Sequence, residues 1–364
     1  MNQIKVSDQI SPILVFFLLH VNLVNFGVLN YQRLVLKHAG LNGWISVAIT
    51  GLSVHLIVWM IFKIVSRGGE AMDLVSVNRA CFGRFGGKIA DLIFILYFGY
   101  GALIAFRSYL SVIEVWLFPT LTLWPITLVI LVLLYYTVSG GLRSVNGLSL
   151  WGTLAAAVCT FPIPIMVWSY LHPLNLLPLF NHTPGELLLA SKDMSVQYAG
   201  VLSLLMIYPF LKTPGKSKKW AHGAVAAATV LYLILILVTF MYYSEYQLQL
   251  LVWPTLHIYM LLELPLFQRL EYMVISILFI TVVANVAFGL WMTCRAAKQS
   301  LHIKQSVSLT LCLLLFLLGV FWIKDYDSLK SISSYHAQVG FYLQYAYVPI
   351  MFILMQFKKK SRPA

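Results

Sequence analysis

Charged residues are scarce in this chain of 364 residues. Only 10% of the residues are Asp, Glu, Lys or Arg, whereas 60% are hydrophobic and the mean hydropathy is +0.84. A soluble domain carries about 25% charged residues and cannot keep this much apolar surface away from water. Apolar runs long enough to cross a hydrocarbon core of about 30 Å as helices recur along the whole chain. The composition therefore excludes a soluble protein and predicts an all-α polytopic membrane protein.

Catalytic and metal-binding motifs are also missing. The sequence holds no HExxH, no GxSxG and no P-loop, and its nine histidines and four cysteines do not fall at metal-ligand spacing. The net charge of +13 lies in short clusters between apolar runs and does not gather on one module, as binding of nucleic acid would require. We therefore expect no enzyme, no catalytic residue, no metal, no cofactor and no nucleic-acid partner.

The apolar runs predict ten membrane spans, near residues 11–32, 42–65, 89–116, 124–139, 149–171, 194–211, 220–243, 271–294, 307–323 and 339–357. If the N-terminus lies inside, eighteen Lys and Arg residues fall in inner segments and six in outer segments. The positive-inside rule then places both termini in the cytoplasm. We expect a single integral membrane domain over residues 1–364, in contact with membrane lipid.

The first predicted span contains the polar stretch HVNLVNFGVLNYQR, residues 20–33. It places Asn22, Asn25 and Asn30 around Gly27, near the middle of the bilayer. Secondary transporters break helices at this depth and point the half-helix ends at substrate and ions. Glycine also frees the backbone to leave the helix. The stretch therefore predicts a broken helix in which these four residues bind substrate. The alternative is that the asparagines bond to neighbouring helices.

The sixth predicted span is interrupted in a similar way by Gly200, Ser203 and Pro209. It comes five spans after the first, as a repeat of five helices requires. A pair of interrupted spans at corresponding positions of two halves indicates a transporter site. We therefore include Gly200 and Ser203 among the substrate-binding candidates. For Pro209 alone, the simpler interpretation is that it ends the helix.

Two further spans carry polar residues. Arg107 lies in the outer half of the third span, where it either meets a carboxylate ligand or an acidic partner, or extends to the lipid headgroups. In the eighth span, Thr281, Asn285 and Gly289 follow one another at steps of four along one helix face. That face suits either helix packing or a cavity wall. Arg107, Thr281 and Asn285 complete the substrate-binding candidates.

The most distinctive segment is LVWPTLHIYMLLELPLFQRLEYM, residues 251–273. Its marked positions are Trp253, Pro254, Thr255, Pro265, Arg269 and Glu271. This pattern resembles a structural motif of the B subunits of Ger-type nutrient germinant receptors of endospore-forming bacteria. The double glycine at 140–141, the NLLPLF stretch at 175–180 and the basic tail also match, so the resemblance covers essentially the whole chain.

The resemblance implies a fold of the amino acid–polyamine–organocation transporter superfamily. This is a LeuT-like five-plus-five inverted repeat with broken helices 1 and 6. The first repeat would span about 11–171 and the second about 194–357, with outer amphipathic loops at 172–193 and 244–270.

The resemblance also implies a role in spore germination. The chain would lie in the inner membrane of the spore with an A subunit and a C lipoprotein as partners. It would sense a small, amino acid-like nutrient between spans one, three, six and eight. The alternatives are an autonomous amino acid or cation transporter of the same fold and an accessory subunit that binds no ligand.

The sequence departs from the family at the presumed pocket. Members similar to the alanine-responsive type have L-G-A-G-L-L-T-L-P-R in the first span, where Asn25 now replaces a glycine and Gln32 replaces the proline. Leu202 and Ser203 stand nearest to an acidic position of that type in the sixth span. We therefore expect the family scaffold with altered pocket chemistry.

Overall fold

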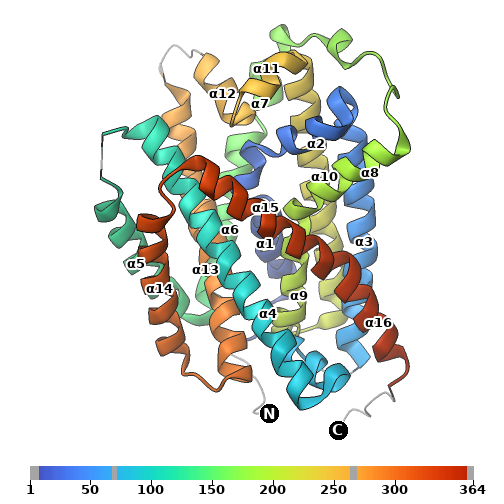
Figure 1. Ribbon diagram of the computed structural model, residues 1–364, viewed down its shortest axis with the longest axis vertical. Helices are drawn as coiled ribbons and strands as arrows, with labels where there is room; N and C mark the ends of the chain where they lie inside the picture. The colour runs from blue at the N-terminus through green and yellow to red at the C-terminus, as the bar shows by residue number, and fades with distance from the viewer. Residues whose placement is uncertain (1–7, 68–71, 121, 263–268, 359–364) are drawn as a thin grey trace.

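The computed structural model describes residues 8–67, 72–120, 122–262 and 269–358. Figure 1 shows most of the long helices running along one axis, with both ends of the described chain at the same end of the molecule. The α-helices are α1 Pro12–Leu23, α2 Tyr31–Ala39, α3 Gly43–Arg67, α4 Leu74–Val112, α5 Leu123–Ser139, α6 Gly141–Thr160, α7 Ile163–Met166, α8 Pro184–Met194, α9 Leu204–Ile207, α10 Pro214–Tyr242, α11 Glu245–Leu250, α12 Pro254–Leu261, α13 Leu270–Ser300, α14 Gln305–Trp322, α15 Tyr326–Tyr342 and α16 Val348–Gln356.

Short segments of other helix types join them. The 3₁₀ segments are η2 Phe26–Leu29, η3 Gly40–Asn42, η5 Trp168–Tyr170, η6 Pro173–Leu176, η7 Ser195–Ser203 and η8 Tyr208–Phe210. The π-helical turns are η4 Ile113–Leu117 and η9 Leu343–Tyr347.

The described helices account for the ten expected spans. Seven helical stretches are long and apolar enough to cross a membrane, and α1 and α5 are shorter apolar helices. The remaining span is divided among α8, η7 and α9. The chain is therefore an integral membrane protein whose first and sixth spans are both interrupted.

Three helices begin earlier than the apolar runs predicted. α4 begins at Leu74 after the cap residue Asp73, and α15 begins at Tyr326 after the cap residue Asp325. α8 begins inside the range 172–193 that was expected to be an outer loop and ends at Met194. Side chains of Asp73, Thr183 and Asp325 accept N–H groups of the first turns, so these caps set where the helices begin, whereas hydropathy marks only the long apolar runs.

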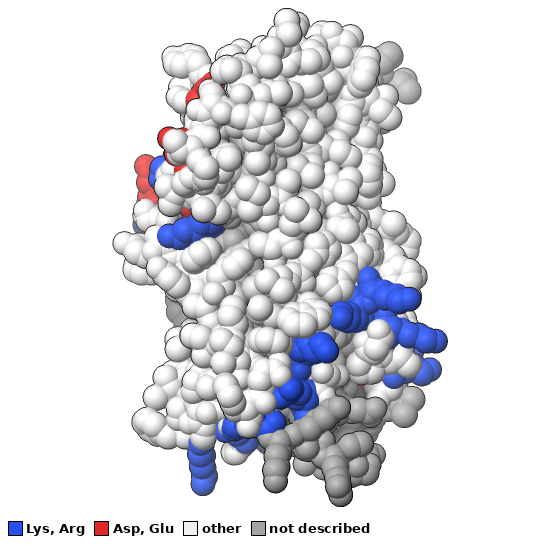
Figure 2. Space-filling model, turned by 90° about the vertical axis from the view of Figure 1, so that its right-hand side faces the viewer, with Lys and Arg blue, Asp and Glu red and all other residues white. Residues whose placement is uncertain are grey.

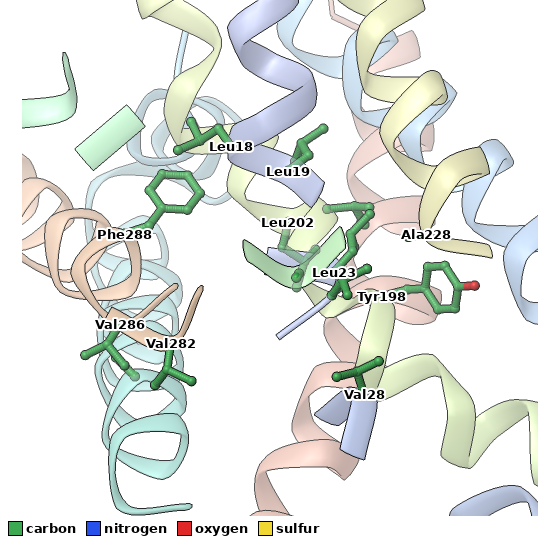
Figure 3. Packing of buried hydrophobic residues seen from close by; sticks show 14 of the residues in the cluster. Leu18, Leu19, Leu23, Val28, Tyr198, Leu202, Ala228, Val282, Val286 and Phe288 are labelled. Atoms are coloured by element: carbon green, nitrogen blue, oxygen red, sulfur yellow. The ribbon is translucent and has the colours of Figure 1, made fainter. Parts of the chain in front are cut away.

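The first span lies in the interior of the bundle. α1 packs against α10 and α6, and every residue from Leu18 to Leu23 is buried. Figure 3 shows Leu23 beside Leu202 and Tyr198 of η7, with Val28 standing apart from it beyond the end of α1. Because protein surrounds this helix, its backbone can leave the helical conformation without exposing polar groups to lipid.

The end of the molecule that holds both chain ends is closed. The backbone N–H of Ile10 donates to the carbonyl of Phe210 at 2.8 Å, and that of Lys212 donates to the carbonyl of Ile10 at 3.1 Å. Nearby, the buried carboxylate of Asp91 accepts from Asn78 at 2.7 Å and from Ser300 at 2.6 Å. These bonds join α4 to α13 and the start of the chain to the end of the sixth span.

Arg107 connects α4 to the turn between α14 and α15. Its guanidinium donates to the carbonyl of Ile323 at 2.7 Å, to the carbonyl of Lys324 at 3.1 Å and to the hydroxyl of Ser111 at 2.7 Å. Glu114 lies 3.6 Å away. The contact with Glu114 agrees with an acidic partner for Arg107, whereas its burial excludes extension to the lipid headgroups. Carbonyls left unpaired at the end of α14 take up the donors that a carboxylate ligand would need.

Replacing Arg107 with methionine should lower the free energy of unfolding by about 3 kcal/mol, because the buried carbonyl of Ile323 and the partly buried carbonyl of Lys324 lose their donors. We expect a clear drop in the midpoint of thermal unfolding of the full chain in detergent. Arg84→Met, at an exposed position of the same helix, is the matched control and should leave the midpoint unchanged. Equal midpoints for the two variants would contradict the structural role.

Candidate functional site

The first span is broken over residues 24–30, as predicted. α1 ends at Leu23, and Asn25 adopts an extended conformation with φ −106° and ψ −155°. Its side chain then caps η2, because Oδ1 accepts the N–H of Gly27 at 2.8 Å while Nδ2 donates to the carbonyl of Asn22 at 3.0 Å. The asparagine at the glycine position of the family therefore closes the break with its own amide.

Side chains from distant helices satisfy the carbonyls at the break. Tyr232 of α10 donates its hydroxyl to the carbonyl of Leu23 at 2.5 Å, and Thr255 of α12 donates to that of Val28 at 3.0 Å. The hydroxyl of Thr255 in turn accepts from the amide of Gln32 at 2.7 Å. Gln32, the replacement for the family proline, thus joins α2 to the Trp-Pro-Thr motif.

Two glycines, Gly200 of the sixth span and Gly27 of the first, allow these spans to approach each other closely. A Cβ on Gly200 would lie 2.7 Å from the Cβ of Asn22 and 3.0 Å from its carbonyl oxygen. On the other side, Gln197 of η7 lies directly against Gly27, where a Cβ would overlap its amide. Only glycine allows the two interrupted spans to meet this closely.

A cavity of about 850 Å³ opens beside this contact. Its walls come from α1, η2, α4, η7 and α13, and therefore from spans one, three, six and eight, but also from α15 of the tenth span. α2, α8 and α11 contribute its outer part, at the end of the molecule opposite the chain ends (Figure 1). We call the charged residues there the rim: Arg33, Lys37, Lys192, Asp193, Glu245 and Lys330.

Six of the nine predicted substrate-binding residues line the cavity: Asn22, Asn25, Gly27, Asn30, Gly200 and Asn285. Arg107, Ser203 and Thr281 do not line it. Ser203 is buried within the core at 1% exposure, and Thr281 donates to the carbonyl of Gly152 at 2.8 Å. Ser203 was selected because it interrupts the sixth span and Thr281 because of its helical spacing, and neither signal tells a cavity wall from a buried contact.

An asparagine pair forms the deepest polar contact of the cavity. Asn285 of α13 donates through Nδ2 to Oδ1 of Asn22 at 2.9 Å, and Asn22 donates to the carbonyl of Leu18 at 3.1 Å. Both interpretations of the first span therefore apply, because the helix is broken and one of its asparagines bonds to a neighbouring helix.

Among the lining residues that the sequence did not indicate are Tyr97, Gln197 and His336. The ring of His336 stacks on Tyr97 with centroids 4.4 Å apart, and its Nε2 lies 3.1 Å from the Tyr97 carbonyl oxygen. His336 belongs to the part of α15 that precedes the predicted tenth span, and Tyr97 resembles any packing residue in sequence. Gln197 was visible in the sequence as a polar residue within an apolar span. Its contact with Gly27 was not, because Gly27 is 170 residues away in the sequence.

The family motif surrounds the outer part of the site. Trp253 packs edge-on against Tyr326 with centroids 6.0 Å apart, and Pro254 is the first residue of α12. Arg269 pairs with the buried Glu271 at 2.6 Å where α13 begins. Pro265 lies outside the described residues.

The Gln32–Thr255 hydrogen bond should show energetic coupling. Thr255→Val should lower the free energy of unfolding by about 1–3 kcal/mol, since it leaves the carbonyl of Val28 without its donor. Gln32→Leu should lower it by about 1 kcal/mol, since one buried hydrogen bond is lost. The double variant should cost less than the sum of the two, by about 1 kcal/mol. Thermal unfolding of the four proteins in detergent measures this, and strict additivity would contradict the coupling.

Known proteins share both the sequence and the fold of this chain. A family model described as "Spore germination protein" matches residues 9–329. Spore germination protein GerQB of Bacillus cereus is 30% identical over 368 residues that cover 100% of both chains. Spore germination protein B2 of Bacillus subtilis (strain 168) is 21% identical over 246 residues, which cover 67% of this chain and 66% of that protein.

Two solved transporter structures show the fold. A Na⁺-coupled sialic acid symporter, substrate-bound and outward-open, superposes with a TM-score of 0.65 over 96% of this chain and 80% of its own, at 13% identity. The nucleobase-cation-symport transporter Mhp1, closed with bromovinylhydantoin bound, gives a TM-score of 0.64 over 96% and 78%, also at 13% identity. The fold is thus a LeuT-like five-plus-five inverted repeat with helices 1 and 6 broken. On this fold and its full-length sequence match, the chain belongs to the spore germination protein family.

Proposed function

We propose that this chain is the B subunit of a nutrient germinant receptor and that it senses a small molecule in the cavity beside the broken first helix. The observation that supports this most is the cavity itself, which lies where the two interrupted spans meet. An A subunit and a C lipoprotein would be its partners in the inner membrane of the spore.

The charge distribution supports a cytoplasmic position for both termini. Figure 2 shows Lys and Arg side chains gathered toward the end that holds both chain ends in Figure 1, with a broad uncharged band above them. Cytoplasmic segments of membrane proteins carry such an excess. In this orientation, the rim faces the outer side of the membrane, from which a nutrient arrives.

Sensing would act through a shift between two arrangements of the bundle. The cavity is bounded on one side by α15 and on the other by the break, and the far end is closed by the pairing of Ile10 with Phe210 and Lys212. A ligand that contacts both sides binds best when α15 lies close to the break, so it favours that arrangement. Partner subunits would then transmit the change.

The test is a nutrient panel applied to spores that lack this gene. We expect loss of germination with at least one nutrient, and recovery when the gene is restored. Full responses to every nutrient would contradict a receptor role. The second candidate is an autonomous transporter, which the symporter-like fold favours. Uptake of a labelled nutrient by vesicles that contain this chain alone would support the transporter and contradict the sensor.

Two glycine substitutions should separate ligand response from folding. Gly27→Ala pushes only on the flexible end of Gln197, so it should shift the half-maximal nutrient concentration about fivefold or more at normal subunit levels. Gly200→Ala meets the backbone of Asn22, so it should lower the subunit level itself.

Gly147→Ala on α6 is the matched control, because a Cβ there meets no atom within 4 Å among the described residues. It should leave both the response and the subunit level unchanged. Immunoblots of spores and germination curves measure the two quantities. A Gly27→Ala response equal to that of Gly147→Ala would contradict a role of the break in sensing.

A further inference from the structure

The deep part of the cavity carries no formal charge. We call five residues its floor: Asn22, Asn25, Gln197, Gly200 and Asn285. Among the described lining residues, every Asp, Glu, Lys and Arg belongs to the rim and comes from α2, α8, α11 or α15. A charged group seated on the floor would lose its hydration without meeting an opposite charge, which costs several kcal/mol.

The N–H of Gly27 at the break is not free to receive a carboxylate. In transporters with broken helices, such donors receive the anionic group of the substrate. Here Oδ1 of Asn25 already accepts the N–H of Gly27 at 2.8 Å, and its Nδ2 donates to the carbonyl of Asn22 at 3.0 Å. The side chain of Asn25 therefore occupies the place that a ligand carboxylate would need.

The asparagine pair leaves one acceptor for a ligand. Asn22 donates to the main-chain carbonyl of Leu18, so its amide orientation is fixed and its Oδ1 must accept from Asn285. Asn285 therefore turns its nitrogen to Asn22 and keeps its oxygen for the cavity. Within the described part of the chain this oxygen forms no hydrogen bond, and it is not sealed from the cavity.

Gln197 leaves the complementary donor. Its Oε1 lies against Gly27, and its Nε2 forms no hydrogen bond with the residues described. Gln197 stands one 3₁₀ turn from Gly200, and residues three apart in such a helix lie above one another. Because Gly200 rests on Asn22, the donor and the acceptor belong to the same floor.

The walls above the floor suit a flat, partly apolar molecule. Phe26 of η2 and Tyr97 and Phe98 of α4 line the cavity. His336 also lines it, but its Nε2 is directed at the carbonyl of Tyr97. Aromatic faces bind planar groups without requiring charge.

We infer that the cavity takes an uncharged ligand with an N–H donor beside a carbonyl acceptor, as in a cyclic amide or imide, and rejects free amino acids. The inference rests on the proposed function only in taking this cavity as the ligand site. It replaces the amino acid-like nutrient of the sequence analysis with a different chemical class.

The test compares matched probes on the purified full chain in detergent. One set is the twenty L-amino acids, and the other is the hydantoins that carry the same side chains, in which an uncharged ring replaces the ammonium and carboxylate groups. Ligand-induced shifts in thermal unfolding and equilibrium dialysis measure binding. We expect saturable binding only among the hydantoins. Methylation of both ring nitrogens should weaken it about fivefold or more, because the acceptor of Asn285 then stays unpaired.

A variant identifies the acceptor. In Asn285→Leu, the methylated and unmethylated rings should bind equally, an effect that a merely structural role would not produce. Should this variant fail to fold, Gln197→Met removes the donor instead. Replacement of the ring carbonyls by thiocarbonyl groups, which are weak acceptors and leave the ring uncharged, should then cost no affinity.

Three results would overturn the inference: binding of an amino acid that is lost when its carboxylate is amidated, equal binding of methylated and unmethylated rings to the unaltered chain, or no binding in either set. Failure of the proposed function has a different signature. In that case, hydantoins bind the purified chain, but spores without the gene respond to every nutrient as before.

Discussion

Hydrogen bonding of the backbone at membrane depth is the constraint on which this structure depends. No water is present there to pair with a free carbonyl, so a helix can be interrupted only where protein supplies partners. The hydroxyl groups of Tyr232 and Thr255 meet the carbonyls on the two sides of the break. The interior position of α1, the packing of α10 around it and the placement of α12 above it all follow from this requirement.

The same requirement explains why the most recognisable motif of the family lies far from the break in sequence. Thr255 reaches the break, Trp253 packs on the start of α15, and Arg269 with Glu271 fixes the start of α13. The motif thus joins three walls of the cavity through contacts that do not involve a ligand.

The sequence predicted the fold class, the approximate spans and the break, because hydropathy and the coincidence of Gly27 with three asparagines are local signals. It did not predict the role of Arg107, whose partners at Ile323 and Lys324 are main-chain carbonyls that leave no trace in residue type. His336 was missed because α15 starts with a polar turn. Gln197 was missed as a site residue because its importance depends on a contact with the first span. Local sequence patterns determine where the helices form, whereas contacts between segments far apart in the sequence determine which polar residues face a cavity.

The attachment made by Arg107 also sets the mechanics of the tenth span. Its donors fix the turn that precedes α15, so this helix has an anchored end and can act as a lever. His336 lies ten residues along the helix from Tyr326, about 15 Å at the rise of an α-helix. A rotation of about 10° about the anchor therefore carries His336 by about 2.5 Å, roughly the width of one atom layer. A small angular change at the anchor would in this way displace the part of α15 that lines the cavity.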